Sequence, residues 1–196
     1  VLPFRYVAAA KHAPQLEDML EGMMLRSLEK AEKLPGRTVL LVDVSGSMWH
    51  GNVSEKSELS RFDAAAALAM LAREICEEVA VYTFSYDAVK VIPRRGFSLR
   101  EQLSNSQQHG GTNAGLAVNK INSLEQYDRI IMFTDEQSHD RVPAPKCKKA
   151  YVLNVASYQN GINNDQVWQT IAGFSEATMD YIREVEKLDH KEEKLN

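Results

Sequence analysis

The sequence predicts an α/β protein with a doubly wound, mostly parallel central sheet, one antiparallel edge strand and helices on both faces. Three observations lead to this class. The four apolar residues Val39–Val42, β-branched at both ends, are typical of a strand buried on both faces. Apolar strands alternate with helical patterns along the chain, which indicates right-handed parallel crossovers. Two of the apolar runs end at an aspartate, Asp43 and Asp135, as expected where such a sheet carries its ligand site.

Length and composition are those of one ordinary globular domain. The chain has 196 residues, of which 44% are hydrophobic and 26% charged. This is enough for a single core that buries roughly 70% of the unfolded surface. The formal net charge of −4 argues against a chain that binds polyanions over its whole surface. Any contact with nucleic acid therefore has to be local.

The same composition bears on location. No apolar run approaches the ~20 residues that a membrane helix needs, so we expect no membrane partner. The first residues do not read as a signal peptide, because Arg5 and Lys11 interrupt their apolar character. Cys76 and Cys147 show no CxxC spacing and are expected to be structural thiols in a reducing compartment. We therefore expect a cytoplasmic protein.

The first part of the chain predicts a helical lead-in to the sheet. Residues 1–13 carry no clear helix-start signal and are expected to enter from an upstream segment. A helix is predicted from Pro14 and ends at Leu34-Pro35-Gly36, a string that cannot continue a helix. Its apolar side must pack on the sheet domain or on an upstream neighbour. The expected division is a helical lead-in over residues 1–36, the α/β domain over 37–188 and a charged, frayed tail over 189–196.

The remaining elements follow from periodicity and punctuation. Ser60 and Asp63 fit a capping box, so a helix is expected to start there. The strand over 89–92 follows its predecessor after a short turn and ends at Pro93, which makes it the antiparallel edge. The other expected strands cover 79–84, 129–134 and 150–155, and the expected helices cover 62–76, 98–105, a stretch through 116 to about 124, 165–172 and 177–187.

The end of the first apolar strand carries candidate metal ligands. Asp43 is followed at alternate positions by Ser45 and Ser47, with a glycine between them that lets the backbone turn. Carboxylate and hydroxyl oxygens suit Mg²⁺, Mn²⁺ or Ca²⁺ rather than Zn²⁺. The alternative is a loop in which Asp43 and Ser45 satisfy turn amides.

Two later positions add to this set. Thr112 follows two glycines at a predicted helix start, where it brings a hydroxyl and backbone amides to one point, although this position taken alone favours an N-cap. Asp135 ends the second buried strand. Neighbouring strands would place both aspartates at one edge, where a cation removes their repulsion. The sequence therefore predicts one divalent cation site, with a coordination position left for an outside acidic group or phosphate, at Asp43, Ser45, Ser47, Thr112 and Asp135.

This set resembles the metal-ion-dependent adhesion site of von Willebrand factor type A domains, whose pattern is Asp-x-Ser-x-Ser, then Thr, then Asp. The resemblance spans about residues 37–187 and implies a Rossmann-like fold. It also implies that the serines and the threonine contact the metal directly or nearly so, that the aspartates often act through water, and that a partner's carboxylate commonly completes the coordination.

Shorter strings resemble the C-terminal part of TROVE-module proteins, the Ro autoantigen family, and its bacterial members in particular. The resemblance implies an upstream ring of helical repeats that binds Y RNA and misfolded RNA, and an association with ribonucleases in the bacterial members. The strings that carry it are Pro3–Ala10, Leu34-Pro35-Gly36, Leu41–Met48, Gly173-Phe174-Ser175 and Met179–Arg183.

These observations predict a metal-dependent binding module of an RNA-binding protein rather than an enzyme. One alternative is a cytosolic scaffold that binds an acidic protein partner without RNA. A less favoured alternative is a magnesium-dependent phosphotransferase, which needs a second carboxylate where Ser45 stands. His50, His109 and His139 are interpreted as loop residues rather than bases. Two basic clusters could contact RNA or a partner, or could be solvated surface: Arg94 with Arg95, and Lys146 with Lys148 and Lys149.

Overall fold

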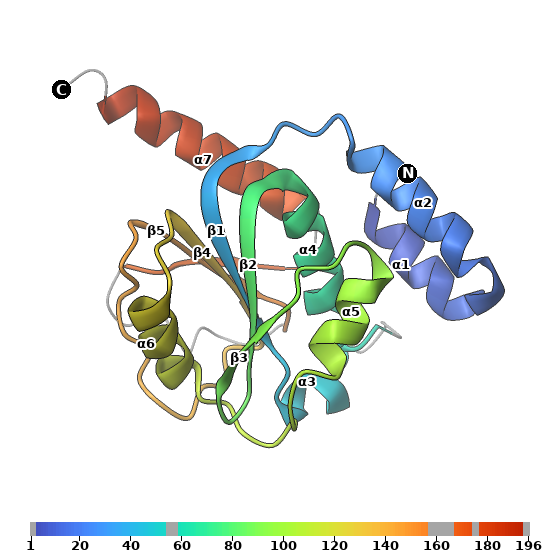
Figure 1. Ribbon diagram of the computed structural model, residues 1–196, viewed down its shortest axis with the longest axis horizontal. Helices are drawn as coiled ribbons and strands as arrows, with labels where there is room; N and C mark the ends of the chain where they lie inside the picture. Colours follow the sequence, from blue (N-terminus) through green and yellow to red (C-terminus); the bar gives the residue numbers. More distant parts are fainter. Residues whose placement is uncertain (1–2, 54–58, 157–166, 174–176, 194–196) are drawn as a thin grey trace.

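A computed structural model describes residues 3–53, 59–156, 167–173 and 177–193 (Figure 1). In these residues the chain forms a six-stranded sheet with the order β3-β2-β1-β4-β5-β6. All neighbouring strands are parallel except β2 and β3, which confirms the predicted sheet and its antiparallel edge. The strands are β1 (Leu34–Asp43), β2 (Cys76–Phe84), β3 (Ala88–Val91), β4 (Arg129–Thr134), β5 (Lys149–Asn154) and β6 (Gln169–Ala172).

Helices cover both faces of this sheet. Buried residues of α1, α2, α4, α5 and α7 share one hydrophobic cluster with inward residues of the strands, whereas α6 contributes to a second cluster on the opposite face. The helices are α1 (Pro3–His12), α2 (Glu17–Leu28), α3 (Gly46–His50), α4 (Arg61–Ile75), α5 (Phe97–Ser104), α6 (Ala114–Leu124) and α7 (Ala177–Glu193), with a 3-10 turn over Pro14–Leu16.

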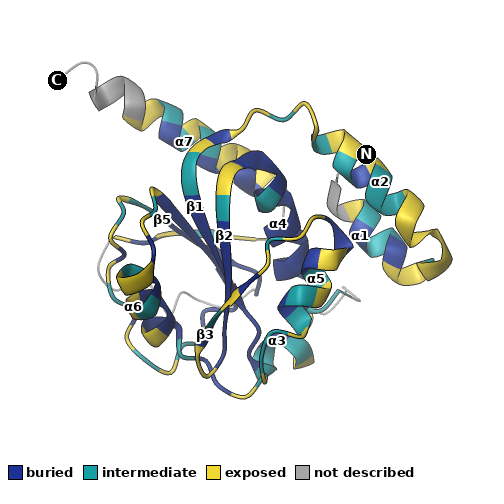
Figure 2. Ribbon diagram, in the orientation of Figure 1, coloured by how far each residue is buried: buried dark blue, intermediate teal, exposed yellow. Residues whose placement is uncertain are grey.

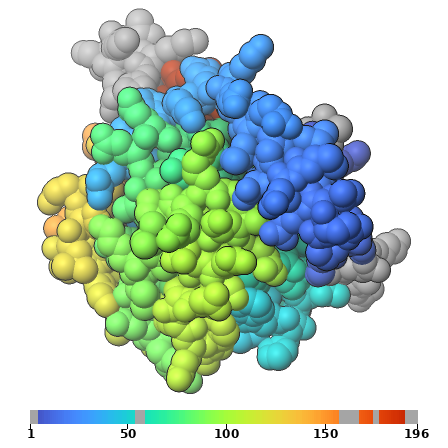
Figure 3. Space-filling model, turned by 45° about the vertical axis from the view of Figure 1, so that its right-hand side comes forward, coloured from blue at the N-terminus to red at the C-terminus, as the bar shows by residue number. Residues whose placement is uncertain are grey.

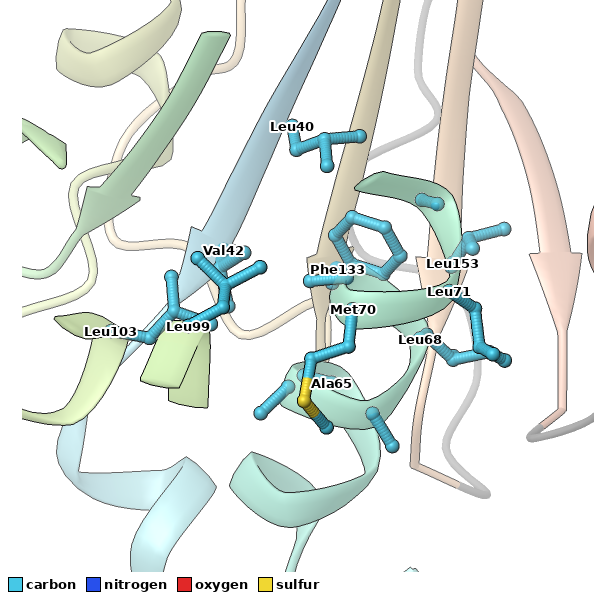
Figure 4. Packing of buried hydrophobic residues seen from close by; sticks show 14 of the residues in the cluster. Leu40, Val42, Ala65, Leu68, Met70, Leu71, Leu99, Leu103, Phe133 and Leu153 are labelled. Atoms are coloured by element: carbon cyan, nitrogen blue, oxygen red, sulfur yellow. The ribbon is translucent and has the colours of Figure 1, made fainter. Parts of the chain in front are cut away.

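Helix α4 is the most deeply buried helix of the larger cluster. Its four consecutive alanines, 64–67, are buried and allow the helix to lie close to the strands. Figure 4 shows Leu68, Met70 and Leu71 of this helix in one hydrophobic cluster with Leu40 of β1 and Phe133 of β4. The Ser60 hydroxyl accepts the amide of Asp63 at 3.0 Å, which confirms the predicted N-cap.

The lead-in differs from the prediction in three ways. Residues 3–12 form helix α1, although no helix-start signal precedes them. The helix predicted from Pro14 to Leu34 is a 3-10 turn followed by α2, which ends at Leu28. Strand β1 already begins at Leu34, because Leu34 pairs with Cys76 and a register irregularity accommodates Pro35 and Gly36.

The lead-in packs on the α/β domain. Val7, Ala10 and Met24 belong to the same cluster as α4, and a carboxylate oxygen of Glu21 accepts the Phe97 amide at 2.6 Å. Figure 3 shows the lead-in beside α5 over one side of the molecule. Part of its apolar surface stays exposed, at Leu16, Met19 and Met23.

The helix predicted over 165–172 is wrong. Residues Gln169–Ala172 form the edge strand β6, which pairs in parallel with β5, while 165 and 166 lie outside the described residues. Backbone hydrogen bonding along the free edge of β5 outweighs the weak helical periodicity here. Trp168, just before this strand, is buried in the α6-side cluster and donates its indole N–H to Pro143 O at 3.2 Å.

The last helix is longer than predicted. Helix α7 continues to Glu193, into the segment predicted as a charged, frayed tail, and the tail's final residues 194–196 lie outside the described part. Figure 2 shows that α7 turns a buried stripe to the sheet and leaves its other side exposed. The segment is therefore charged but helical up to Glu193.

Candidate metal centre

The two predicted aspartates lie at the point where the order of the strands reverses. Strand β1 lies between β2 and β4, and Val42 is in register with Phe133, so the carboxyl ends of β1 and β4 are adjacent. Asp43 ends β1 and Asp135 directly follows β4. Both residues are fully buried, and their charges are close enough to interact.

Asp43 is held from two sides. Its Oδ1 accepts the amide of Ser45 at 2.9 Å, so the alternative prediction of a turn-amide role is correct for this oxygen. Its Oδ2 accepts the Thr134 hydroxyl at 2.7 Å. Burial raises the pKa of Asp43 to about 7, although bonds from Ser45 and Thr134 lower it, and the Asp135 carboxylate raises it further. A cation beside Asp43 would favour its ionised form.

Ser45 and Ser47 extend this set of oxygens toward the surface. Their hydroxyl oxygens lie 3.3 Å apart at the start of α3. Ser45 is buried, whereas Ser47 is half-buried. The cluster therefore opens to the outside on the Ser47 side.

Asp135 forms an ion pair with an arginine of the chain. Its Oδ2 accepts a hydrogen bond from Nη1 of Arg61, the first residue of α4, at 2.9 Å. Its Oδ1 accepts the Gln137 amide at 3.3 Å. The following residue, Glu136, has a φ of 61°, a left-handed conformation that is uncommon outside glycine. The amide of Glu136 donates to Thr134 Oγ1, so this turn also fixes the hydroxyl that holds Asp43.

Thr112 is buried in a loop that is anchored to the same edge. Ser85, which follows β2, donates its hydroxyl to Gly111 O at 3.0 Å and accepts the Asn113 amide on its own carbonyl at 2.9 Å. A ring nitrogen of His109 lies 2.7 Å from Val44 O, directly after Asp43. These bonds bring Thr112 to the edge that carries the aspartates.

The structure gives the start of α6 a different arrangement from the prediction. Asn113, not Thr112, is the N-cap residue, so the N-cap alternative for Thr112 is wrong. The amides of Gly115 and Leu116 donate to the two oxygens of Asp140 at 2.8 Å each. These helix amides are therefore engaged by a carboxylate of the chain itself.

The donor set fits a hard divalent cation. Within the described residues, no three His, Cys, Asp or Glu side chains come close enough together to hold a metal ion. A metal at this edge would therefore rely on two carboxylates together with hydroxyls, which is chemistry that Mg²⁺, Mn²⁺ and Ca²⁺ accept and Zn²⁺ does not prefer. The residues that would hold it are Asp43, Ser45, Ser47, Thr112 and Asp135.

The basic clusters lie toward the amino ends of the parallel strands, opposite the carboxyl ends that carry the aspartates. Arg95 bonds to Glu74 near the end of α4, and β3 runs away from the carboxyl ends before it reaches Arg94. Lys149 is in register with Arg129 at the amino ends of β5 and β4. The loop that carries Lys146 and Lys148 precedes Lys149. These residues stay predictions as partner contacts, but they cannot act on a group bound between Asp43 and Asp135.

Three residues that organise the site were missed from the sequence. Ser85 and Thr134 lie at the carboxyl ends of β2 and β4, so their positions were a usable signal once the strand order was expected. Arg61 gave no such signal, because its place in a capping box says nothing about the direction of its side chain. His109 was interpreted as a loop residue, and its ring packs on Trp49 with 4.7 Å between centroids.

The family can now be stated. The chain belongs to the von Willebrand factor type A domain family, whose model matches residues 38–137. Among solved structures, the chain is similar to the RO (RSR) protein of Deinococcus radiodurans, with 20% identity and a TM-score of 0.68. That match covers 86% of this chain and 38% of the Deinococcus chain.

Two further structures are similar at a lower level. An aerotolerance-related membrane protein of Bacteroides fragilis shows 20% identity and a TM-score of 0.44, over 61% of this chain and 67% of that one. BatB of Bacteroides thetaiotaomicron, a conserved hypothetical protein, shows 16% identity and a TM-score of 0.49, over 80% of this chain and 100% of that one. A comparison with curated proteins gives no match. Over the described residues, no helix has the length and apolar character needed to cross a membrane.

Proposed function

We propose that this chain is a metal-dependent binding module. One divalent cation, Mg²⁺ or else Mn²⁺ or Ca²⁺, would bind at Asp43, Ser45, Ser47, Thr112 and Asp135 and hold an acidic group of a partner. The observation that carries the proposal is the pair of fully buried carboxylates, Asp43 and Asp135, at the reversal of strand order. Buried charges of one sign are costly unless a positive charge compensates them.

The proposed setting is a cytoplasmic RNA-binding protein of the TROVE type. Support comes from the strings that resemble this family and from a fold similar to the Deinococcus RO (RSR) protein. This chain spans 38% of that protein, so the activity of the whole is part of the proposal. Y RNA would bind mainly to an upstream helical ring, and the cation would hold an RNA phosphate or a carboxylate of a protein such as a ribonuclease.

A protein scaffold without RNA is the second candidate. The net charge of −4 favours it, because counterion release supplies most of the affinity for nucleic acid. Catalysis is disfavoured by chemistry: phosphotransfer from an aspartate needs an acid two residues later, where Ser45 stands, and His109 is committed to Val44 O and Trp49.

Calorimetric titration with Mg²⁺, Mn²⁺ and Ca²⁺ tests the proposal. Wild type is expected to bind one ion and Asp43→Ala none, because the variant loses the carboxylate that the turn and Thr134 orient. Asp87→Ala is the matched control, since Asp87 is an exposed aspartate paired with Lys120 and is expected to leave metal binding unchanged.

Thermal melting gives an independent readout. An ion that binds only the folded chain raises the melting temperature with its concentration. EDTA should lower the melting temperature without unfolding the chain at 25 °C, because the apolar core does not depend on the ion. Equal metal binding by wild type and Asp43→Ala would refute the assigned site.

A further inference from the structure

Arg61 is an internal cation placed at the candidate metal centre. Its Nη1 donates to Asp135 Oδ2 at 2.9 Å, and the two side chains are 10% and 0% exposed. Since Asp135 is one of two neighbouring buried carboxylates, the guanidinium already supplies part of the positive charge that this edge needs.

The surrounding backbone is shaped around this guanidinium. A Cβ atom at Gly51 would lie 2.4 Å from Arg61 Cζ, so a larger residue there would force the guanidinium to shift. The Arg61 amide donates to Gly51 O at 2.9 Å, and Asn52 forms an antiparallel bridge with Ser60. Gly51 directly follows α3, the helix that begins beside Ser45 and Ser47. The chain therefore leaves the candidate metal centre through α3 and Gly51, and Arg61 at the start of α4 returns to it.

We propose that Arg61 is a tethered competitor for the metal ion, whose guanidinium must release Asp135 before a divalent cation binds there. The inference rests on the proposed function. Its physical basis is repulsion: two unit charges 4 Å apart interact by about 4 kcal/mol at an effective dielectric constant of 20. A dication doubles this cost, so the guanidinium and the ion do not share the Asp135 carboxylate. Arg61 thereby sets the metal affinity of the module and couples metal binding to the contact between Arg61 and Gly51.

Arg61→Met tests this in the full chain. Methionine keeps a long apolar side chain and removes the charge, so the affinity for Mn²⁺ measured by calorimetry is expected to rise at least tenfold over wild type. The matched control is Arg100→Met. Arg100 of α5 bonds to Asp63, which lies on α4 as Arg61 does but is not a site carboxylate. This control should leave Mn²⁺ affinity unchanged.

Melting in EDTA and in Mn²⁺ supplies a second readout. Without an added ion, Arg61→Met should melt below wild type because Asp135 loses its partner, and Mn²⁺ should raise its melting temperature more than it raises that of wild type. Arg61→Lys keeps a charge but loses the planar fork. Its Mn²⁺ affinity is expected between those of wild type and Arg61→Met, and it decides the matter where the methionine variant does not fold.

The outcomes separate the two proposals. Mn²⁺ binding by Arg61→Met but not by wild type would support competition and refute the proposed function of the wild-type chain. Binding by wild type with equal or weaker binding by Arg61→Met would overturn the competition and make Arg61 a residue that positions Asp135. No binding by either protein would refute both.

Discussion

At the scale of single residues, Thr134 determines how Asp43 is presented. Its hydroxyl donates to Asp43 Oδ2 and accepts the amide of Glu136, so one side chain links the end of β1 to the turn after β4. Valine has nearly the same shape but lacks the hydroxyl. We expect Thr134→Val to lower the free energy of unfolding by about 1–3 kcal/mol and to weaken metal binding, as measured by urea unfolding and calorimetry.

A second buried threonine provides the control. Thr83 on β2 is also buried, and its hydroxyl lies 2.7 Å from that of Ser106 rather than beside an aspartate. Thr83→Val should cost similar stability and leave metal affinity unchanged. Metal affinity that is equal in Thr134→Val and wild type would show that Thr134 does not orient a ligand.

The sequence allowed good prediction of carboxylates at strand ends and poor prediction of the groups that neutralise them. Asp43 and Asp135 follow apolar runs, and parallel strands bring their ends to one edge, so their proximity could be expected. Arg61 lies 74 positions before Asp135 and reaches it past Gly51, which has no side chain to displace the guanidinium. Such a contact depends on the path of a loop, which no local periodicity encodes.

At the scale of elements, α7 is fastened to the sheet by a buried ionic cluster. The Glu186 carboxylate on α7 accepts hydrogen bonds from Nε and Nη2 of Arg129 and from Nζ of Lys149. The Tyr151 hydroxyl donates a further hydrogen bond to it at 3.2 Å. Burial opposes ionisation of Glu186, but the bonds from Arg129 and Lys149 outweigh it and lower its pKa. The helix therefore depends on a charged carboxylate.

Glu186→Gln tests this dependence. It leaves Arg129 buried beside a neutral partner, so we expect the free energy of unfolding to fall by about 3 kcal/mol at pH 7. A carboxyl group with a lowered pKa contributes stability that is present above about pH 4.3, its unfolded value, and is lost as pH falls through its folded value. Wild type should therefore lose stability on acidification below about pH 4.3, and the variant should lose less.

Another glutamate on α7 is the matched control. Glu184 is exposed and pairs with Lys187 at the surface. Glu184→Gln should change the free energy of unfolding by no more than about 0.5 kcal/mol. An acid-unfolding curve of Glu186→Gln that coincides with wild type would contradict a stabilising role for the buried cluster.

Prediction of the elements failed where tertiary contacts outweighed local patterns. The capping box of α4 and the edge strand β3 follow from nearby residues and were predicted. Strand β6 forms because β5 offers a free edge, and α1 forms because Val7 and Ala10 reach the core beside α4. Neither contact can be predicted from the residues of β6 or of α1 alone.

At the scale of the whole molecule, charge and geometry predict weak binding to RNA. The net charge is negative, and the basic residues Lys149 and Arg95 lie at the amino ends of the strands, away from the candidate metal centre. We expect a dissociation constant for structured RNA of roughly 10⁻⁴ to 10⁻⁶ M at physiological salt, with a strong salt dependence. A fluorescence titration measures it, with Asp43→Ala and EDTA as controls for the metal. Nanomolar affinity retained in Asp43→Ala would place an RNA site within this chain that does not use the metal.

The edges of the sheet bear on how the molecule behaves at high concentration. An exposed strand edge offers unpaired amide and carbonyl groups on which a second chain can add, and long flat edges promote fibrils. Here each edge strand has only four residues, and β3 is followed closely by Pro93, which cannot donate a backbone hydrogen bond. Lys90 of β3 further carries a charged side chain, which pairs with Glu125. The native chain is therefore a poor template for amyloid-like growth, and aggregation through the sheet would first require an edge strand to detach.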